Sequence, residues 1–524
     1  MRDRSDVIAE IRGVNEPWDM LIIGGGATGI GTALDSASRG FRTLLLEQHD
    51  FGKGTSSRST KLVHGGVRYL RQGDVSLVFE ALKERGLMLQ NAPHLVRNQS
   101  FVIPAYDWWE GPFYTVGLKV YDMMAGKMGL GPSRLISREE TIELLPTIEK
   151  KGLKGGIIYH DGQFDDARML ISLAQTCEDH NGFLVNYFRV VDLVKEKGLV
   201  SGVMAVDQET GEEFHIAARA IINATGVFAD DILRMDDPET GNMIRPSQGI
   251  HLVLNNTFLQ GRYAIMVPQT SDGRVMFAVP WYDKVVVGTT DTLVDNASLE
   301  PKPLVEEIDF VLSTTGQYLV NDPNREDVLS VFAGLRPLAV SGDNDKSTKE
   351  ISRHHKVMVS VTGLISVIGG KWTTYRKMAE DAVDYAIMVG DLAERKCLTH
   401  HLPVHGYMRT TKTPISPMSV YGQDKTLIED ISHASFGNDP YLSKSLGIYK
   451  AQVTWAVREE MARTLEDVLA RRTRALFLDA KESLRIAPEA ARFMATELNQ
   501  DHHWIASQLK HFNQLVQSYL IDLS

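Results

Sequence analysis

A glycine-rich loop between an apolar strand and a helix is the feature that most constrains the fold of this chain. Residues 19–23 have the pattern of a buried strand, 27–38 the spacing of a helix, and 43–46 the pattern of a second strand. The loop after the first strand carries the G-x-G-x-x-G spacing, formed by Gly24, Gly26 and Gly29. Glycine there permits a tight turn, a close approach of backbone N–H groups to a pyrophosphate, and close packing of helix on strand.

Glu47 ends the second strand, where a carboxylate can accept hydrogen bonds from ribose hydroxyl groups. The helix that begins at Ala27 adds partial positive charge beside the expected phosphates. The sequence therefore predicts a βαβ unit that binds a dinucleotide, without choosing which one. A glycine-rich turn in another α/β protein is the alternative that the motif leaves open.

The composition is that of an ordinary globular protein, and it excludes several classes. The formal net charge of -11 over 524 residues argues against a general nucleic-acid binder, which needs a surplus of Lys and Arg. The two cysteines, Cys177 and Cys397, lie far apart, so we expect no disulfide framework, no metal site and a cytoplasmic setting. The charged N-terminus is unlike a signal peptide, and no apolar run reaches the roughly 18 to 20 residues of a membrane-spanning helix.

The rest of the chain alternates between short strands and helices. Residues 188–223 have the pattern of a β meander, which ends at "NATG", a stretch small enough for backbone to pass close to a cofactor. Strand patterns from 249 to 291 predict a second sheet that covers the substrate, and those from 331 to 387 a return to the first domain. Helical spacing after about residue 402 predicts a separate C-terminal domain.

These patterns predict a discontinuous arrangement of domains. We expect an N-terminal extension, a cofactor-binding domain in three pieces, a substrate-binding domain in two pieces, and a C-terminal helical domain. In that order, their ranges are 1–17; 18–105, 155–235 and 330–395; 106–154 and 236–329; and 400–524.

Two further motifs point to redox chemistry beside an anion. In "IGGKWTTYRK", residues 368–377, a glycine turn leads from a strand into a helix, whose N-terminus would stabilise the negative charge that a flavin acquires on reduction. Nicotinamide has no matching need, and a threonine-capped turn is the alternative. In "STKLVHGGVRY", residues 59–69, three cationic or titratable side chains surround a Gly-Gly pair: Lys61, His64 and Arg68.

Together with other segments, these motifs resemble the FAD-dependent glycerol-3-phosphate dehydrogenases, which are linked to the quinone pool. The resemblance spans about residues 18 to 480, and its most specific parts are "KLVHGGVRYL" and "GGKWTTYRK". The segments that carry it, in order, are the 24–29 loop with Glu47, 55–70, 223–226, 279–291, 334–338, 351–353, 369–380 and 467–474.

The resemblance implies an α/β fold of the D-amino-acid-oxidase type: a Rossmann-like FAD-binding domain, a mixed-sheet substrate domain and an all-helical C-terminal cap. It implies oxidation of sn-glycerol 3-phosphate to dihydroxyacetone phosphate, with hydride passing to FAD N5 and electrons to ubiquinone or menaquinone. It also implies a peripheral place on the cytoplasmic face of the inner membrane. A homodimer is a further expectation, and nucleic acid is not an expected partner.

The resemblance also implies roles for individual residues. Expected beside the flavin are Ser59, Lys61, Leu62, His64, Gly65, Gly66, Thr225, Gly226, Gly370, Lys371 and Thr373, where Gly65 and Gly66 would let the ring approach the backbone. Expected at the substrate phosphate, which guanidinium groups hold best, are Arg68, Tyr69 and Arg353. Expected in catalysis are His251 as the base, with Arg336 and Lys371 stabilising the developing oxyanion.

Each of these roles has a structural alternative. His251 lies in an alternating strand, where a histidine is commonly structural, and His64 could be a hydrogen-bonded loop residue. Arg336 before Pro337 could simply end a strand, and Arg353 could be a solvated charge.

Segment 106–124 is aromatic, as is common at bilayer interfaces, but it is not basic, so packing inside the protein is equally open. Positive charge in the C-terminal domain could share lipid contact or form a solvated helix face; it comes from Arg463, Arg471, Arg472 and Arg474.

Three other functions compete with the implied one. A glycerol-3-phosphate oxidase would use oxygen as acceptor, but its added middle segment has no counterpart between Asp291 and Gly334. An amine or amino-acid oxidase of the same fold would need one carboxylate-binding arginine rather than several cations. A flavin-binding redox sensor without turnover would need the glycine loop but not those cations.

Overall fold

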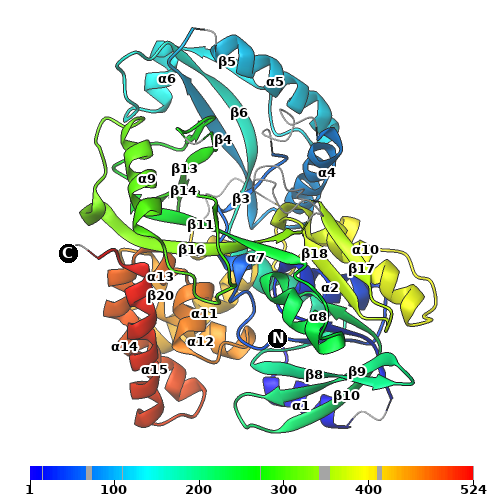
Figure 1. Cartoon of the computed structure of the whole chain (residues 1–524). Coiled ribbons are helices and arrows are strands. Elements are labelled where there is room, and N and C mark those ends of the chain that lie inside the picture. Colours follow the sequence, from blue (N-terminus) through cyan, green and yellow to red (C-terminus); the bar gives the residue numbers. More distant parts are fainter. Residues whose placement is uncertain are drawn as a thin grey trace.

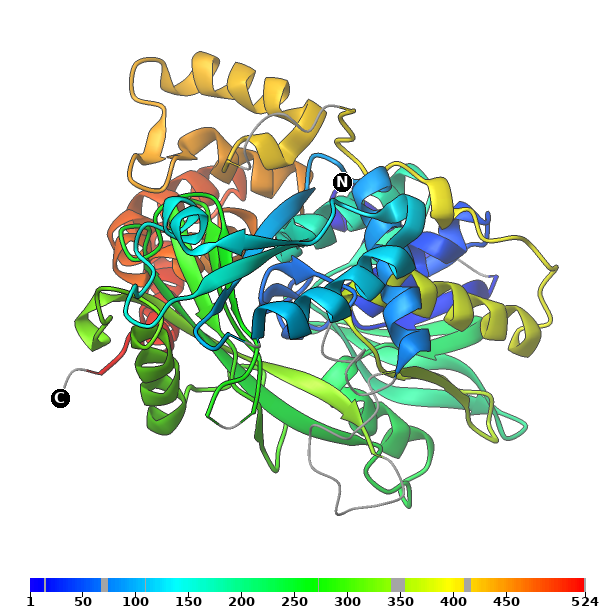
Figure 2. The ribbon, with the colours of Figure 1, turned by 90° about the horizontal axis from the view of Figure 1, so that it is seen from above.

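The computed structural model describes residues 1–13, 16–66, 74–108, 110–271, 273–340, 354–409 and 416–522. Within them the chain builds two large β-sheets and a C-terminal group of helices (Figure 1). Seen from above in Figure 2, the C-terminal helices lie on one side of the molecule and the first sheet with its helices on the other. This is the predicted fold class.

The first sheet is parallel at its centre, because apolar runs such as "LLL" suit strands covered on both faces. Strand β1 (Trp18–Ile23) pairs in parallel with β2 (Thr43–Leu46) and β10 (Glu213–Asn223), and α2 (Ala27–Ser38) connects β1 to β2. The predicted βαβ unit is therefore confirmed. The order continues outward through β7 (Phe183–Val185) on one side and β18 (Ile365–Gly369) and β17 (His355–Val359) on the other.

An antiparallel meander extends β10, as the sequence predicts. It consists of β8 (Phe188–Glu196) and β9 (Leu199–Asp207), which pairs with the first half of β10. Helices α2, α7 and α10 pack beside one another on the sheet. Helix α7 spans Asp166–Asp179 and α10 spans Tyr375–Val389. Two further helices of this domain are α1 (Arg4–Gly13) and α8 (Ala229–Asp236).

The second sheet is mixed and bears helices on its outer side. Its order is β15 (Thr292–Leu293), β11 (Ile244–Asn255), β14 (Lys284–Gly288), β13 (Met276–Trp281), β12 (Ala264–Val267), β4 (Val96–Ala105), β6 (Gly155–Phe164) and β3 (Leu62–Val63). Strand β16 (Val328–Ala339) adds to β11, and β5 (Arg134–Ser137) adds to β6. The associated helices are α4 (Val75–Asn91), α5 (Glu110–Ala125), α6 (Arg138–Leu144) and α9 (Val305–Gly316).

Four strands from the predicted cofactor-binding domain belong to the second sheet. Residues 62–63, 96–105, 155–164 and 328–339 fall wholly or mostly in that predicted domain, but β3, β4, β6 and β16 hydrogen-bond within the second sheet. The strand pattern that begins at residue 331 predicts most of β16. It does not encode the partner, because strand pairing here joins segments far apart in the chain.

The C-terminal region is helical, as predicted, apart from a small hairpin. Its elements are α11 (Lys425–Phe436), β19 (Tyr441–Ser443), β20 (Ile448–Tyr449), α12 (Lys450–Glu459), a π-helical turn (Asp467–Arg472), α13 (Ala475–Leu478), α14 (Ala480–Glu497) and α15 (His502–Val516). Helices α13 and α14 pack against β16.

Buried ion pairs join this region to the first sheet. Arg472 holds Asp50, which follows β2, at 2.6 and 2.8 Å, and Arg471 contacts the same carboxylate. Arg471, Arg472 and Arg474 are each at most 3% exposed. They are therefore neither a solvated face nor a lipid contact; they neutralise carboxylates of the first domain instead.

The first residues are tied to the same domain. Helix α1 packs beside β7, Val7 is fully buried, and the Arg4 guanidinium pairs with Asp207 at 2.5 Å. The segment expected as an extension is thus part of the first domain's core over its described residues.

Candidate functional site

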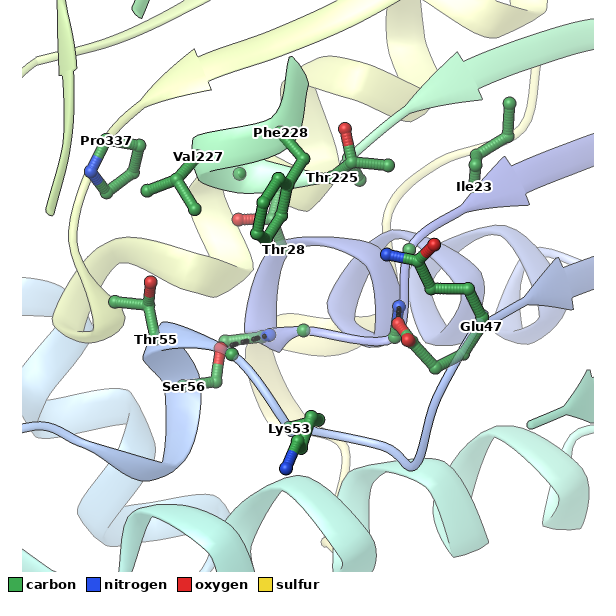
Figure 3. A pocket seen from close by; sticks show the side chains of 18 of the residues that line it. Ile23, Thr28, Glu47, Lys53, Thr55, Ser56, Thr225, Val227, Phe228 and Pro337 are labelled. Carbon is green, nitrogen blue, oxygen red and sulfur yellow. Dashed lines mark hydrogen bonds between the residues drawn. The ribbon is translucent and has the colours of Figure 1, made fainter. Parts of the chain in front are cut away.

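A first cavity of about 230 Å³ lies where the carboxyl ends of β1, β2 and β10 meet the start of α2. Figure 3 shows Glu47 near one end of it and Thr55 near the other, with Thr225 and Phe228 on the side of β10. The crevice beyond strand ends is where open α/β sheets bind ligands.

Glycine is required at two loop positions for steric reasons. A Cβ on Gly24, whose φ is +108°, would lie 2.8 Å from the carbonyl oxygen of Ala224. A Cβ on Gly29 would lie 1.8 Å from the carbonyl oxygen of Gly24. Gly29 therefore serves the packing of helix on loop and does not line the cavity, whereas Gly24 and Gly26 do.

Glu47 is anchored by backbone rather than by cations. Its carboxylate accepts hydrogen bonds from the N–H groups of Gly25 at 2.5 Å and His49 at 2.8 Å. Burial raises the pKa of Glu47 to about 7, although both hydrogen bonds favour its charged form. The anchored carboxylate lines the cavity as the ribose contact of a dinucleotide would.

The second glycine motif closes the other end of this cavity. Four residues that are expected beside the flavin line it, namely Gly370, Lys371, Thr225 and Gly226, and Gly370 has φ +87°. The short helix η5 (Trp372–Thr374) follows, and the Trp372 indole donates to the Ser56 carbonyl at 2.8 Å. The cradle of glycine backbone, a helix N-terminus and an anchored carboxylate fits a dinucleotide such as FAD.

A second cavity of about 180 Å³ lies between β3, β6, β13 and β16. Of the predicted residues it is lined by Leu62, His64, Gly66 and Arg336. Arg336 and Pro337 are consecutive in β16 and line the second and first cavities respectively, so the two cavities adjoin there. Its aromatic walls come from Phe101, Tyr159 and Phe277.

The Arg336 guanidinium is held in place by the neighbouring loop. It donates to the Gln248 carbonyl at 3.2 Å, the Thr289 hydroxyl at 3.1 Å and the Thr290 carbonyl at 2.9 Å. Gly249 makes room for it, since a Cβ there would lie 2.3 Å from a guanidinium nitrogen. A preorganised cation in a half-enclosed cavity is suited to stabilise negative charge.

His251 lies behind the second cavity and does not line it. The ring is 3% exposed, stacks on Phe332 at 4.9 Å, and its Nε2 lies 2.9 Å from the hydroxyl oxygen of Thr60, which does line the cavity. Burial holds the pKa of His251 well below its ordinary value, with Lys61 and Arg336 adding to the effect. The imidazole is therefore neutral near pH 7.

Ser59 and Lys61, which are expected beside the flavin, line neither cavity. Both bind Asp166 at the start of α7: the Ser59 hydroxyl and the Lys61 ammonium each lie 2.7 Å from its carboxylate. Arg474 reaches the same carboxylate at 3.0 Å. A fully buried ammonium needs such a partner, and burial lowers the pKa of Lys61 to about 7.

Gly65 and Thr373 act as links rather than as cavity walls. The Thr373 hydroxyl accepts a hydrogen bond from the backbone N–H of His64 at 3.2 Å, which joins the two motifs that carry the predicted site. Gly65 is buried under Tyr121, and a Cβ there would lie 2.6 Å from the tyrosine oxygen. Three further predicted residues, Arg68, Tyr69 and Arg353, lie outside the described residues.

Thr60, Asp161 and Arg274 are among the residues of the second cavity that were not predicted as site residues. Arg274 precedes β13, and Asp161 lies within β6, so each comes from a different part of the chain. Among the signals in the sequence, only the adjacency of Thr60 to Lys61 could have suggested one of them.

Two family models match the chain. The first, described as FAD dependent oxidoreductase, matches residues 19–376. The second, described as the C-terminal domain of alpha-glycerophosphate oxidase, matches residues 360–504.

Relatives and solved structures agree with these models. The chain is 38% identical to a mitochondrial glycerol-3-phosphate dehydrogenase of Arabidopsis thaliana over 97% of this chain and 86% of that protein. It is also 38% identical to the human mitochondrial enzyme of that name, covering 94% and 72%. The structure of glycerol-3-phosphate dehydrogenase from Bacillus halodurans, complexed with FAD, superposes with a TM-score of 0.80 at 28% identity, covering 99% and 98% of the two chains.

Proposed function

Because the chain belongs to the family of FAD-dependent glycerol-3-phosphate dehydrogenases, we propose that it oxidises sn-glycerol 3-phosphate to dihydroxyacetone phosphate and passes the electrons to a membrane quinone. The observation that carries the proposal is the second cavity, which is lined by two arginines, Arg274 and Arg336, and adjoins the glycine-built first cavity at Arg336 and Pro337. Such a pair suits a phosphate dianion better than a neutral or cationic substrate.

FAD, when bound in the first cavity, supplies the acceptor of the hydride from carbon 2 of the substrate. The chain prepares this step electrostatically. Lys371 lines the first cavity beside Gly370, so its positive charge and the helix start after it favour the negative charge of the reduced state.

The second cavity provides groups for the rest of the chemistry. Arg274 suits the substrate phosphate, while the anchored Arg336 suits the oxygen on which charge develops as the hydroxyl proton leaves. His64 lines this cavity directly, whereas His251 reaches it only through Thr60 and is held neutral by burial. We therefore assign the hydroxyl proton to the His64 ring rather than to His251.

A quinone acceptor requires contact with a membrane, and one surface is suited to it. On α5 an apolar stripe at helical spacing faces solvent: Phe113, Val116, Val120 and Met123, which are 54%, 67%, 37% and 75% exposed. Trp108 before it is 82% exposed, and Phe79 on the adjoining α4 is 58% exposed. Among the described residues, no helix is long and apolar enough to cross a bilayer.

We call the six residues Phe79, Trp108, Phe113, Val116, Val120 and Met123 the α5 surface. Aromatic and aliphatic side chains exposed together favour burial at a lipid interface. In this proposal the α5 surface rests on the cytoplasmic face of the inner membrane, where quinone is available. Both helices lie at the same edge of the molecule in Figure 1.

The central test is anaerobic. The yellow protein receives sn-glycerol 3-phosphate while flavin absorbance is followed, and the reduced enzyme is then offered a water-soluble quinone or oxygen. Bleaching followed by fast recovery with quinone and slow recovery with oxygen is expected. Fast recovery with oxygen would favour an oxidase, and absence of bleaching would refute the substrate assignment.

Membrane contact has a separate test. Phe113→Asp combined with Met123→Asp is expected to abolish cosedimentation with vesicles of phosphatidylethanolamine and phosphatidylglycerol. Val320→Asp, at a residue that is 52% exposed elsewhere, is the matched control and should leave cosedimentation intact. Equal binding by both variants would remove the α5 surface from the proposal.

A further inference from the structure

Helix α5 has a buried face as well as an exposed one. Leu118, Tyr121 and Ala125 point inward, and Tyr121 is 1% exposed. Tyr121 packs with Val78 and Leu82 of α4 in a small apolar cluster. Its hydroxyl group is therefore held at the end of a rigid, fully packed ring.

The Tyr121 hydroxyl joins two segments of the site. It accepts a hydrogen bond from the backbone N–H of Gly65 at 2.8 Å and donates to Asp161, whose carboxylate oxygens lie at 2.8 and 3.0 Å. The direction of both bonds is fixed, because a backbone N–H only donates and a carboxylate only accepts. Arg85 completes the chain with an ion pair to Asp161 at 2.7 Å.

Both hydrogen-bond partners of the Tyr121 hydroxyl border the second cavity. Asp161 lines it on β6, and the residues on either side of Gly65, namely His64 and Gly66, line it as well. The absence of a side chain at Gly65 follows from the same contact, since a Cβ would lie 2.6 Å from the tyrosine oxygen and 2.7 Å from Leu82. The first glycine of the Gly-Gly pair therefore leaves room for the Tyr121 hydroxyl group.

We propose that Tyr121 is a positioning residue for the oxidation: its hydroxyl fixes the backbone at Gly65 and thereby sets the place of the His64 ring and of Gly66 at the second cavity. The inference rests on the proposed function, in which the ring of His64 takes the hydroxyl proton. A displacement of a reacting group by about 1 Å can lower a rate on the order of 100-fold. Loss of the hydroxyl would free the backbone at Gly65 and remove one donor from Asp161, while every side chain that lines the cavity would be kept.

The test is Tyr121→Phe, which deletes one oxygen and keeps the ring. Expected are an unchanged flavin content and a kcat for glycerol 3-phosphate lowered roughly 10- to 100-fold, with KM changed less than threefold. Hydrogen exchange at the peptide containing Gly65 should speed up in the same variant. A purely structural role would lower thermal stability and leave kcat as it is.

Tyr106→Phe is the matched control, because the Tyr106 hydroxyl also makes one internal bond, to the Glu149 carbonyl at 2.9 Å, but lines neither cavity. It should lose stability only. An unchanged kcat in Tyr121→Phe would overturn the inference while the wild-type enzyme still bleaches with substrate. If wild type itself does not bleach, it is the proposed function that fails.

If Tyr121→Phe does not fold, Gly65→Ala tests the same link from its other end. The added Cβ would lie 2.6 Å from the Tyr121 oxygen and so displaces the backbone at Gly65, which lines neither cavity, and kcat should again fall more than KM rises. An unchanged kcat in this variant would likewise overturn the inference.

Discussion

The two cavities of this protein are built from different materials. The first is shaped mainly by backbone: glycines at 24, 29 and 370, amide groups around Glu47, and the starts of α2 and η5. The second is shaped by side chains from six strands and the loops beside them, with Arg336, Arg274 and Asp161 far apart in the sequence. The first cavity depends on the absence of a Cβ atom at its glycines, whereas the second depends on the side chains that line it.

This difference predicts different failures. Adding a single carbon atom at a glycine whose Cβ would meet backbone should destroy the first cavity, because backbone cannot move aside. Removing a charged side chain should leave the shape of the second cavity intact but lower the rate of the reaction or the affinity for substrate. The two kinds of damage are separable by flavin content and by rate.

The largest expected effect is that of Gly29→Ala. The added Cβ would lie 1.8 Å from the Gly24 carbonyl oxygen, so the glycine loop must rearrange and FAD binding should be lost, with all activity. Gly54→Ala is the matched control, since Gly54 lines the same cavity but a Cβ there meets nothing within 4 Å. Flavin absorbance per mole of purified protein measures both; a full complement of flavin in Gly29→Ala would contradict the backbone account.

Arg336→Ala should spare the first cavity and damage the second. We expect bound FAD to be retained and the rate of flavin reduction to fall about 100- to 1,000-fold, the usual cost of losing one stabilising donor. Stopped-flow absorbance under anaerobic conditions gives the rate. Arg234→Ala, at an exposed ion pair with Asp231, serves as control and should reduce at the wild-type rate; an unchanged rate in Arg336→Ala would remove it from the mechanism.

A smaller and different effect is expected for Arg274→Ala. Because a guanidinium on the phosphate acts in the ground state as well as in the transition state, KM should rise about 10- to 100-fold while kcat changes little. Arg262→Ala, at a cation that lines neither cavity, should leave KM as it is. Steady-state kinetics over a wide substrate range decides, and a fall in kcat alone would place Arg274 at the reacting carbon instead.

The smallest expected effect concerns stability outside both cavities. Hydrogen bonds to Asp179 and Asp424 raise the pKa of His405 to about 9. Since this folded-state pKa exceeds the ordinary 6.5, the stabilisation is fully present below pH 6.5 and is lost as pH rises through 9. It should amount to about 1 kcal/mol or less, because the imidazole is partly solvated.

His405→Gln should therefore melt below wild type at pH 6 and together with it near pH 10. His433→Gln, on the exposed side of α11, is the control and should show no such convergence. Differential scanning calorimetry across this pH range measures the gap. A gap that persists at high pH would assign the effect to packing rather than to charge.

What the sequence predicts well is local. The strand at 19–23, the helix at 27–38 and the glycine loop between them are adjacent in the chain, and their apolar spacing and steric needs are sufficient to place them. The same holds for Glu47 and for Gly370, each of which lies at a strand end. The first cavity is therefore largely readable from the sequence.

The sequence does not predict which residues far apart in the chain contact one another. Ser59 and Lys61 lie near a glycine pair in the sequence and are expected beside the cofactor. In the structure both side chains bind the carboxylate of Asp166, more than a hundred positions later. Arg274 and β16 likewise take their places through strand pairing. The local sequence pattern predicts the helix or strand to which a residue belongs. It does not predict which residues of other helices and strands will contact it.

The meeting at Asp166 also has a consequence for how the protein is made. Lys61 precedes this carboxylate in the chain, whereas Arg474 follows it by 308 residues. At a synthesis rate of roughly 5 to 20 residues per second, the ribosome needs about 15 to 60 seconds to deliver the second cation after making the carboxylate. During that interval Lys61 and Asp166 of the nascent first domain lack Arg474 and the C-terminal helices that bury them. The core around Asp166 is therefore complete only after the C-terminal region has been synthesised.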